Sequence, residues 1–122
     1  MKNREDKIKQ YFNMWLTKNG ENLRELFADN IVYTECYGPE YHGILNIIDW
    51  FQAWNKYGTV LRWDIKQMLH QGNLVAVEWY FECEYEGNID GFDGVSIIQF
   101  NKNEKIEVIK EFQSKAEHTI IR

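Results

Sequence analysis

The stretch LFADNIVYTECYGPEYHG, residues 26–43, decides the fold that we predict. Its centre, residues 31–37, is rich in β-branched and aromatic residues, which is typical of a strand. The pair Gly38-Pro39 ends this strand and contains the only proline of the chain. The predicted strand therefore places Glu35 and Tyr37 near its far end.

One long helix is predicted after this strand. The segment 44–57 is apolar on more than one helical face and lies between Gly43 and Gly58, so we expect a helix that packs on two sides. Beyond Gly58 the apolar residues alternate along the chain instead of recurring at helical spacing, which predicts strands. We expect four strands, at residues 61–70, 75–86, 89–101 and 105–115, joined by short polar or glycine turns.

Two further helices are predicted before the first strand. Apolar residues from Ile8 to Leu16 recur at helical spacing, and Asn19-Gly20 is a typical helix end. Asn22 and Glu25 have the spacing of a capping box, which predicts a short second helix, and Asp29-Asn30 is then expected to form a turn. The order of elements predicts an α+β fold with three N-terminal helices packed on a strongly curved antiparallel or mixed sheet.

The composition combines many aromatic side chains with a negative charge. Aromatic residues make up 16% of the chain, the net charge is -5, and no Lys or Arg lies between Lys66 and Lys102. A protein surface that binds nucleic acid needs cationic side chains against the phosphates of the nucleic acid, so we expect no nucleic-acid partner. No segment has the 18 or more consecutive apolar residues of a membrane span, and we expect no membrane partner either.

Several classes of site are absent from the sequence. The eight glycines form neither a GxGxxG nor a GxxxxGK[ST] loop, and the three histidines lack metal-ligand spacing, so we expect no cofactor and no metal. Cys36 and Cys83 form no CxxC pair, and the first ten residues lack the apolar core of a secretory signal. These features favour a cytoplasmic protein.

The stretch 26–43, the stretch FDGVSIIQFNKNEKI at 92–106 and the order of elements resemble the nuclear-transport-factor-2-like superfamily, in particular its SnoaL-like branch. The resemblance covers nearly the whole chain and implies one domain over residues 1–122. It implies a cone-shaped α+β barrel with a pocket in its interior, and a homodimer. Members include isomerases, cyclases and dehydratases, so the fold by itself does not select an activity.

The resemblance to the ketosteroid isomerases of this superfamily implies three catalytic residues. Glu35 lies at the position of their carboxylate base, Asp93 at that of their protonated donor and Tyr11 at that of their tyrosine donor. Each residue also has a structural interpretation. Glu35 would be a carboxylate at the pocket rim, Asp93 a bulge residue between two glycines, and Tyr11 a core side chain on the apolar stripe of its helix.

The aromatic residues on the predicted core faces are candidates for the pocket wall. The alternative for each is simple core packing. The predicted ligand-binding residues are Trp15, Tyr33, Trp50, Trp54, Trp63 and Trp79.

Three hypotheses about function remain open on the sequence. The first is cofactor-free acid–base catalysis on an apolar or aromatic small molecule, as in the isomerases and cyclases of the superfamily. The second is a non-catalytic module that binds a hydrophobic ligand or dimerises. In the third, tryptophan fills the interior of the cone and leaves no pocket.

Overall fold

The computed structural model describes residues 2–121. Its three helices and six strands confirm the predicted α+β class. The elements follow in the order α1 (Lys2–Thr17), α2 (Leu23–Leu26), β1 (Phe27–Thr34), β2 (Glu40–His42), α3 (Ile44–Tyr57), β3 (Gly58–Gln71), β4 (Leu74–Tyr85), β5 (Asn88–Phe100) and β6 (Ile106–Lys115).

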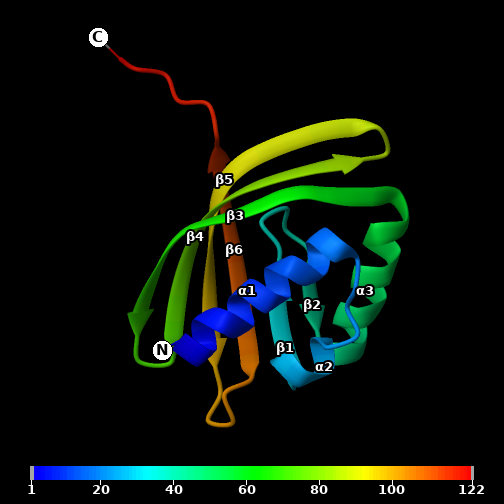
Figure 1. The fold of residues 1–122 in the computed structure, drawn as a ribbon, viewed down its shortest axis with the longest axis vertical. Coiled ribbons are helices and arrows are strands. Elements are labelled where there is room, and N and C mark those ends of the chain that lie inside the picture. The colour runs from blue at the N-terminus through cyan, green and yellow to red at the C-terminus, as the bar shows by residue number, and fades with distance from the viewer. Residues whose placement is uncertain (1, 122) are drawn as a thin grey trace.

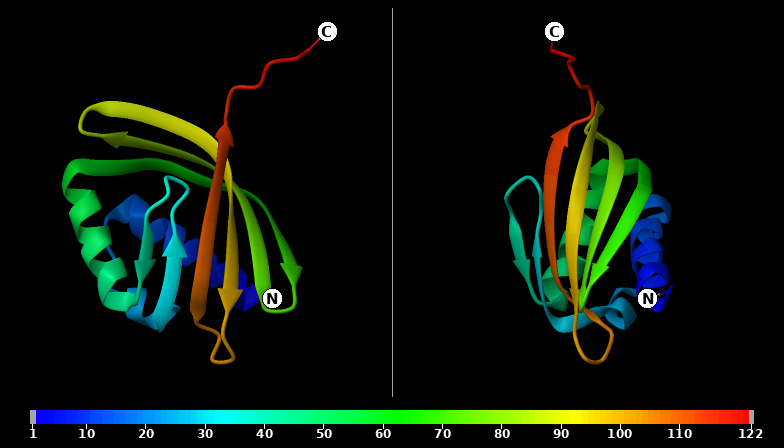
Figure 2. Two further views of the ribbon diagram at one scale, coloured as in Figure 1. Left: turned by 180° about the vertical axis from the view of Figure 1, so that it is seen from behind. Right: turned by 90° about the vertical axis from the view of Figure 1, so that its left-hand side faces the viewer.

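The strands form one mixed sheet in the order β2-β1-β6-β5-β4-β3. Only the β1–β6 pair is parallel, and the other neighbours are antiparallel. The long strands β3, β4 and β5 bend strongly, and α1 lies across the concave side of the sheet, with α3 next to the end where β3 begins (Figure 1, Figure 2). The bend and the two long helices leave an interior between them, as the predicted cone requires.

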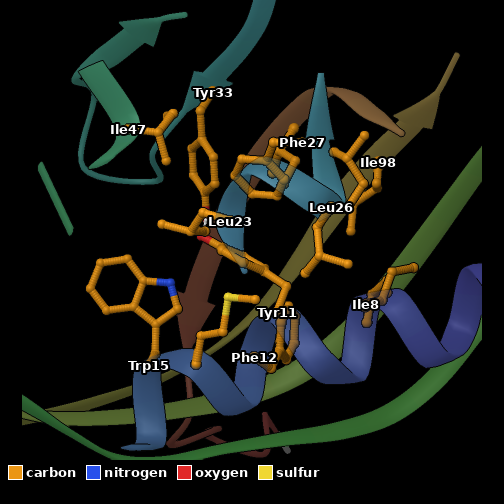
Figure 3. Packing of buried hydrophobic residues seen from close by; sticks show 14 of the residues in the cluster. Ile8, Tyr11, Phe12, Trp15, Leu23, Leu26, Phe27, Tyr33, Ile47 and Ile98 are labelled. Atoms are coloured by element: carbon orange, nitrogen blue, oxygen red, sulfur yellow. Dashed lines mark hydrogen bonds between the residues drawn. The ribbon is translucent and has the colours of Figure 1, made fainter. Parts of the chain in front are cut away.

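The core lies between α1 and the concave side of the sheet. Ile8, Tyr11, Phe12 and Trp15 recur at helical spacing on α1 and are all buried. Tyr11 lies against the fully buried Phe27 of β1 (Figure 3). Phe12 stacks on Trp63 of β3, and Trp15 packs against α3. Burial of each large apolar side chain stabilises the fold by roughly 1.5–3 kcal/mol, so this stripe fixes the position of α1 on the sheet.

The structure corrects the boundaries of the first strand. β1 begins at Phe27, so Asp29-Asn30 lies within the strand and forms no turn. It ends at Thr34, which leaves Glu35 and Tyr37 in the loop that follows. This loop turns back into β2, a short strand that the sequence pattern did not predict, and pairs it with the end of β1.

The structure also shortens the second helix. α2 has four residues, and the side chain of Asn22 makes no capping hydrogen bond. The chain therefore lacks the predicted capping box. The backbone N–H of Leu26 still bonds the carbonyl of Asn22, which closes one helical turn before β1 begins.

Bulges change which side chains of β3 face the core. The pairing of β3 with β4 slips between Val60 and Arg62 and again between Ile65 and Gln67. Because one extra residue reverses the facing of those beyond it, simple alternation fails here. Trp63 is buried as predicted, whereas the side chain of Leu69 is 61% exposed.

Candidate active site

A cavity opens into the interior between α1, α3 and the concave side of the sheet. Its volume is about 40 Å³, or about 420 Å³ when the open space at its mouth is included. A cavity of this size has room for more than one water molecule, so the interior is not packed shut. Its walls consist of Trp15, Tyr33, Glu35, Cys36, Tyr37, Trp50, Trp54, Val60, Trp63, Trp79, Phe81, Phe92 and Glu111.

Contacts with other aromatic rings hold the wall tryptophans in place. Trp63 stacks on Phe12 of α1 with 3.8 Å between ring centroids, and Trp50 stacks on Tyr41 of β2 at 4.5 Å. The indole N–H of Trp79 donates to the buried hydroxyl of Ser96 at 2.9 Å. Such contacts fix the ring planes, so the wall presents preformed aromatic surfaces to a ligand.

A chain of hydrogen bonds leads from α1 to one carboxyl group in the wall. The Tyr11 hydroxyl donates to the Tyr33 hydroxyl at 2.8 Å, and Tyr33 donates to Oε2 of Glu111 at 2.5 Å. Both tyrosines are only 1% exposed. Burial raises the pKa of each phenol well above its usual value, so both remain neutral donors.

Glu111 holds a proton at neutral pH. Desolvation by its surroundings raises the pKa of this carboxyl group from 4.5 to about 8. The hydrogen bonds from Tyr33 and from the backbone of Cys36 act in the opposite direction, whereas the nearby Glu35 raises the pKa further. At pH 7 most molecules therefore carry a neutral carboxylic acid at this position.

Glu35 is the second carboxyl group of the wall and lies in the loop after β1. Desolvation also raises its pKa, and the hydrogen bond from the Tyr41 hydroxyl, at 2.9 Å, opposes that shift. Glu35 also borders a surface groove outside the cavity, so water reaches it more readily than Glu111. Glu35 is therefore the less desolvated of the two carboxyl groups.

The other ionisable groups of the wall remain neutral. Burial raises the pKa of the Cys36 thiol to about 12, so it is not a thiolate nucleophile at neutral pH. Burial likewise raises the pKa of Tyr37. Within residues 2–121 no group of three or more His, Cys, Asp or Glu side chains is placed to hold a metal ion.

The model of the SnoaL-like domain family matches residues 8–109 of the chain. The chain belongs to the SnoaL-like family. No curated protein matches its sequence. Many solved structures do match the SnoaL-like domain in fold.

Three of these solved structures show the range of sequence identity and structural similarity. A hypothetical protein from Catenulispora acidiphila with a ketosteroid isomerase-like fold, solved with trimethylamine, has 17% identity and a TM-score of 0.77 over 90% of this chain and 85% of its own. A candidate SnoaL-like polyketide cyclase from Mesorhizobium loti has 20% identity and a TM-score of 0.69, covering 88% and 97%. An NTF2-like protein of unknown function from Burkholderia pseudomallei has 11% identity and a TM-score of 0.77, covering 93% and 92%. At these identities the likeness establishes the fold alone.

The SnoaL-like domain brings most of the sequence-predicted site residues to one cavity. Glu35 lines it, and the six aromatic residues predicted as ligand-binding do so as well. Tyr11 does not line the cavity, because its hydroxyl bonds to Tyr33 and its ring packs in the core (Figure 3). Its contact with the site passes through Tyr33.

The structure places Asp93 away from the cavity. Phe92 lines the cavity, and because neighbours on a strand face opposite sides, Asp93 faces outward. Its side chain bonds Lys66 at 2.9 Å and His118 at 3.3 Å. These two groups lower its pKa, the reverse of what a protonated donor needs, so the role implied by the resemblance does not apply here.

Glu111 is the carboxyl group of the site that the sequence reasoning missed. The alternation along residues 105–115 put Glu111 on one face with Ile109 but did not show which face is buried. A bulge next to Phe100 brings both Ile106 and Ile109 into the core, although they are three residues apart on the strand. Glu111, two residues after Ile109, then also faces inward. The apolar side chain of Ile109 was the available signal.

Proposed function

We propose that this SnoaL-like domain binds a small apolar or aromatic molecule in its cavity and catalyses a proton transfer on it without a cofactor. Glu35 is the base, Glu111 is the neutral donor, and Tyr33 positions Glu111. One observation carries the proposal: two carboxyl groups line the same aromatic cavity, and only Glu35 also borders the surface groove, so the two differ in their access to water. Such a pair divides the roles of base and acid between its members.

The proposed reaction removes a proton from a carbon next to a carbonyl group. The Glu35 carboxylate accepts the proton as the C–H electron pair moves toward the carbonyl oxygen. The carboxyl proton of Glu111 forms a hydrogen bond with that oxygen as negative charge develops there. Return of the proton from Glu35 to a different carbon, or to the same one, restores both residues. The aromatic walls exclude water and strengthen both interactions.

The structural relatives support a small ligand and this class of chemistry. The chain shares its family with candidate polyketide cyclases, and its fold resembles that of ketosteroid isomerases. The Catenulispora protein contains trimethylamine, a molecule of only four non-hydrogen atoms. In the present chain the tryptophans narrow the cavity to about 40 Å³, which favours a ligand far smaller than a steroid.

Deuterium exchange into a simple ketone tests the proposed proton transfer. With phenylacetone in D₂O, the protein should catalyse deuterium exchange at the carbon next to the carbonyl. Proton NMR measures the exchange rate from the loss of the signal of these protons. Glu35→Gln, which cannot accept the proton, should lower the catalysed rate at least tenfold. Glu111→Gln keeps a neutral donor and should lower it less.

Glu84→Gln is the control for this experiment, because Glu84 is an exposed glutamate on β4 away from the cavity. It should exchange at the wild-type rate. Equal rates in the wild type and in Glu35→Gln would contradict the proposal and favour a non-catalytic binding module.

The homodimer stays a proposal. Ile97 of β5 and Phe112 of β6 are 38% and 56% exposed on the outer side of the sheet, where a second copy of the chain would cover them. Sedimentation equilibrium would measure the oligomeric state.

No helix within residues 2–121 is long and apolar enough to span a membrane.

A further inference from the structure

A groove on the surface forms the mouth of the cavity. It shares Glu35, Tyr37, Trp50 and Trp54 with the cavity wall, so these four side chains border both spaces. The remaining side chains of the groove are Tyr41, Ala53, Tyr57 and Tyr85. Aromatic rings therefore surround one carboxyl group, Glu35, where the groove adjoins the cavity.

Glu35 lies among side chains that carry no positive charge, in the part of the chain that the structure describes. Within residues 2–121, neither the cavity nor the groove is lined by a Lys, Arg or His side chain. The hydrogen bond that Glu35 accepts in the structure comes from the neutral Tyr41 hydroxyl. The net charge of the whole chain is -5, so the protein's overall field also favours cations over anions. An anionic ligand would face an uncompensated carboxylate at the mouth.

The aromatic rings at the mouth suit a particular kind of cation. Trp50 and Trp54 are partly buried and border both the cavity and the groove, and Tyr37 and Tyr57 are 53% and 63% exposed. The face of an aromatic ring attracts a cation, and tryptophan does so most strongly. A methylated ammonium group is weakly hydrated and fills such a space with methyl groups, so it loses little on leaving water.

We propose that the mouth of the cavity binds a small methylated ammonium group, with Glu35 as its counter-ion and the rings of Trp50 and Trp54 against its methyl groups. This proposal deepens the proposed function and rests on it for one link: the ammonium group belongs to the molecule on which Glu35 acts as a base. A nearby positive charge also makes a C–H bond more acidic, which would assist that step.

A charged and a neutral ligand of the same shape test this proposal. Choline and 3,3-dimethylbutan-1-ol differ only in a nitrogen that replaces a carbon, so a difference in affinity measures the charge. Titrations at pH 7, followed by the fluorescence of the wall tryptophans, should show choline binding at least tenfold more tightly. Trp54→Leu should weaken choline binding more than it weakens binding of the alcohol.

Variants of Glu35 identify the counter-ion. In Glu35→Gln the preference for choline should fall below threefold, whereas Glu35→Asp, which keeps the charge, and Glu84→Gln should retain it. Equal affinities for the two ligands in the wild type, no binding of choline at 10 mM, or an undiminished preference in Glu35→Gln would overturn the proposal.

The two proposals fail in different experiments. Binding of choline requires no turnover, so a preference for choline without deuterium exchange into phenylacetone would leave the cation site standing and reject the proton transfer. Exchange that depends on Glu35, without any preference for choline, would reject the cation site and leave the proton transfer.

Discussion

Replacement of Glu111 by Gln should remove much of the loss of stability that the wild-type protein undergoes between pH 5 and pH 9. The pKa of Glu111 is about 8 in the folded chain and 4.5 as its ordinary value. The folded state thus holds the proton more tightly than the unfolded state, and the resulting stability is present below pH 4.5 and is lost as the pH rises through 8. The linkage amounts to about 4 kcal/mol between pH 5 and pH 9 as an upper limit.

Urea unfolding at pH 5, 7 and 9 measures this effect through the free energy of unfolding. From pH 5 to pH 9, the free energy of unfolding of Glu111→Gln should rise relative to that of the wild type by up to about 4 kcal/mol. Glu84→Gln, at an exposed position, should follow the wild type at each pH. A difference that does not change with pH would mean that Glu111 is ionised throughout, and the proposed donor would then be wrong.

Gly94→Ala should destabilise the protein by about 3 kcal/mol, because the added methyl group overpacks the core. Gly94 of β5 pairs with Trp79 of β4, and a Cβ atom there would collide with the Trp79 ring. It would also lie 2.5 Å from the carbonyl oxygen of Phe112, which is backbone and cannot rotate away. The absence of a side chain at Gly94 therefore creates the space in which this wall tryptophan lies.

Gly91→Ala on the same strand is the matched control. A Cβ atom on Gly91 would meet chiefly the hydroxyl end of Tyr80, which can move, because this side chain lies on the outer side of the sheet. The expected cost is below about 1 kcal/mol. The free energy of unfolding from urea titrations separates the two variants. Similar costs for both would show that the packing of Trp79 does not depend on Gly94.

The positions of the wall tryptophans were predictable from local patterns. Trp15 lies on the apolar stripe of a helix, and Trp79 lies on the apolar side of a strand that alternates without interruption. In both cases the period of the element decides which side chains face inward. The element order followed from the same patterns, apart from the short β2, whereas the family came from the resemblance of residues 26–43 and 92–106 to the SnoaL-like branch.

Asp93 and Glu111 show where local patterns no longer predict which way a side chain faces. Asp93 lies between two glycines, whose lack of side chains hides the facing of the strand. Glu111 lies beyond a bulge that moves two isoleucines into the core. Bulges arise from how two strands pair, and pairing joins residues far apart in the chain. The pattern of one strand therefore could not decide which acid faces the cavity.

By itself, the sequence determined the fold class and the aromatic wall, because periodic burial of apolar side chains depends on residues close together in the chain. Its resemblance to the SnoaL-like branch indicated the family. Only the tertiary structure decided which carboxyl groups share the cavity and that Glu111 holds a proton there. The protonation of Glu111 comes from desolvation, which outweighs the opposing hydrogen bond from Tyr33, and the chain brings the surrounding groups together from α1, β1 and β6. Desolvation is a property of the assembled interior, so no single segment of the sequence contains it.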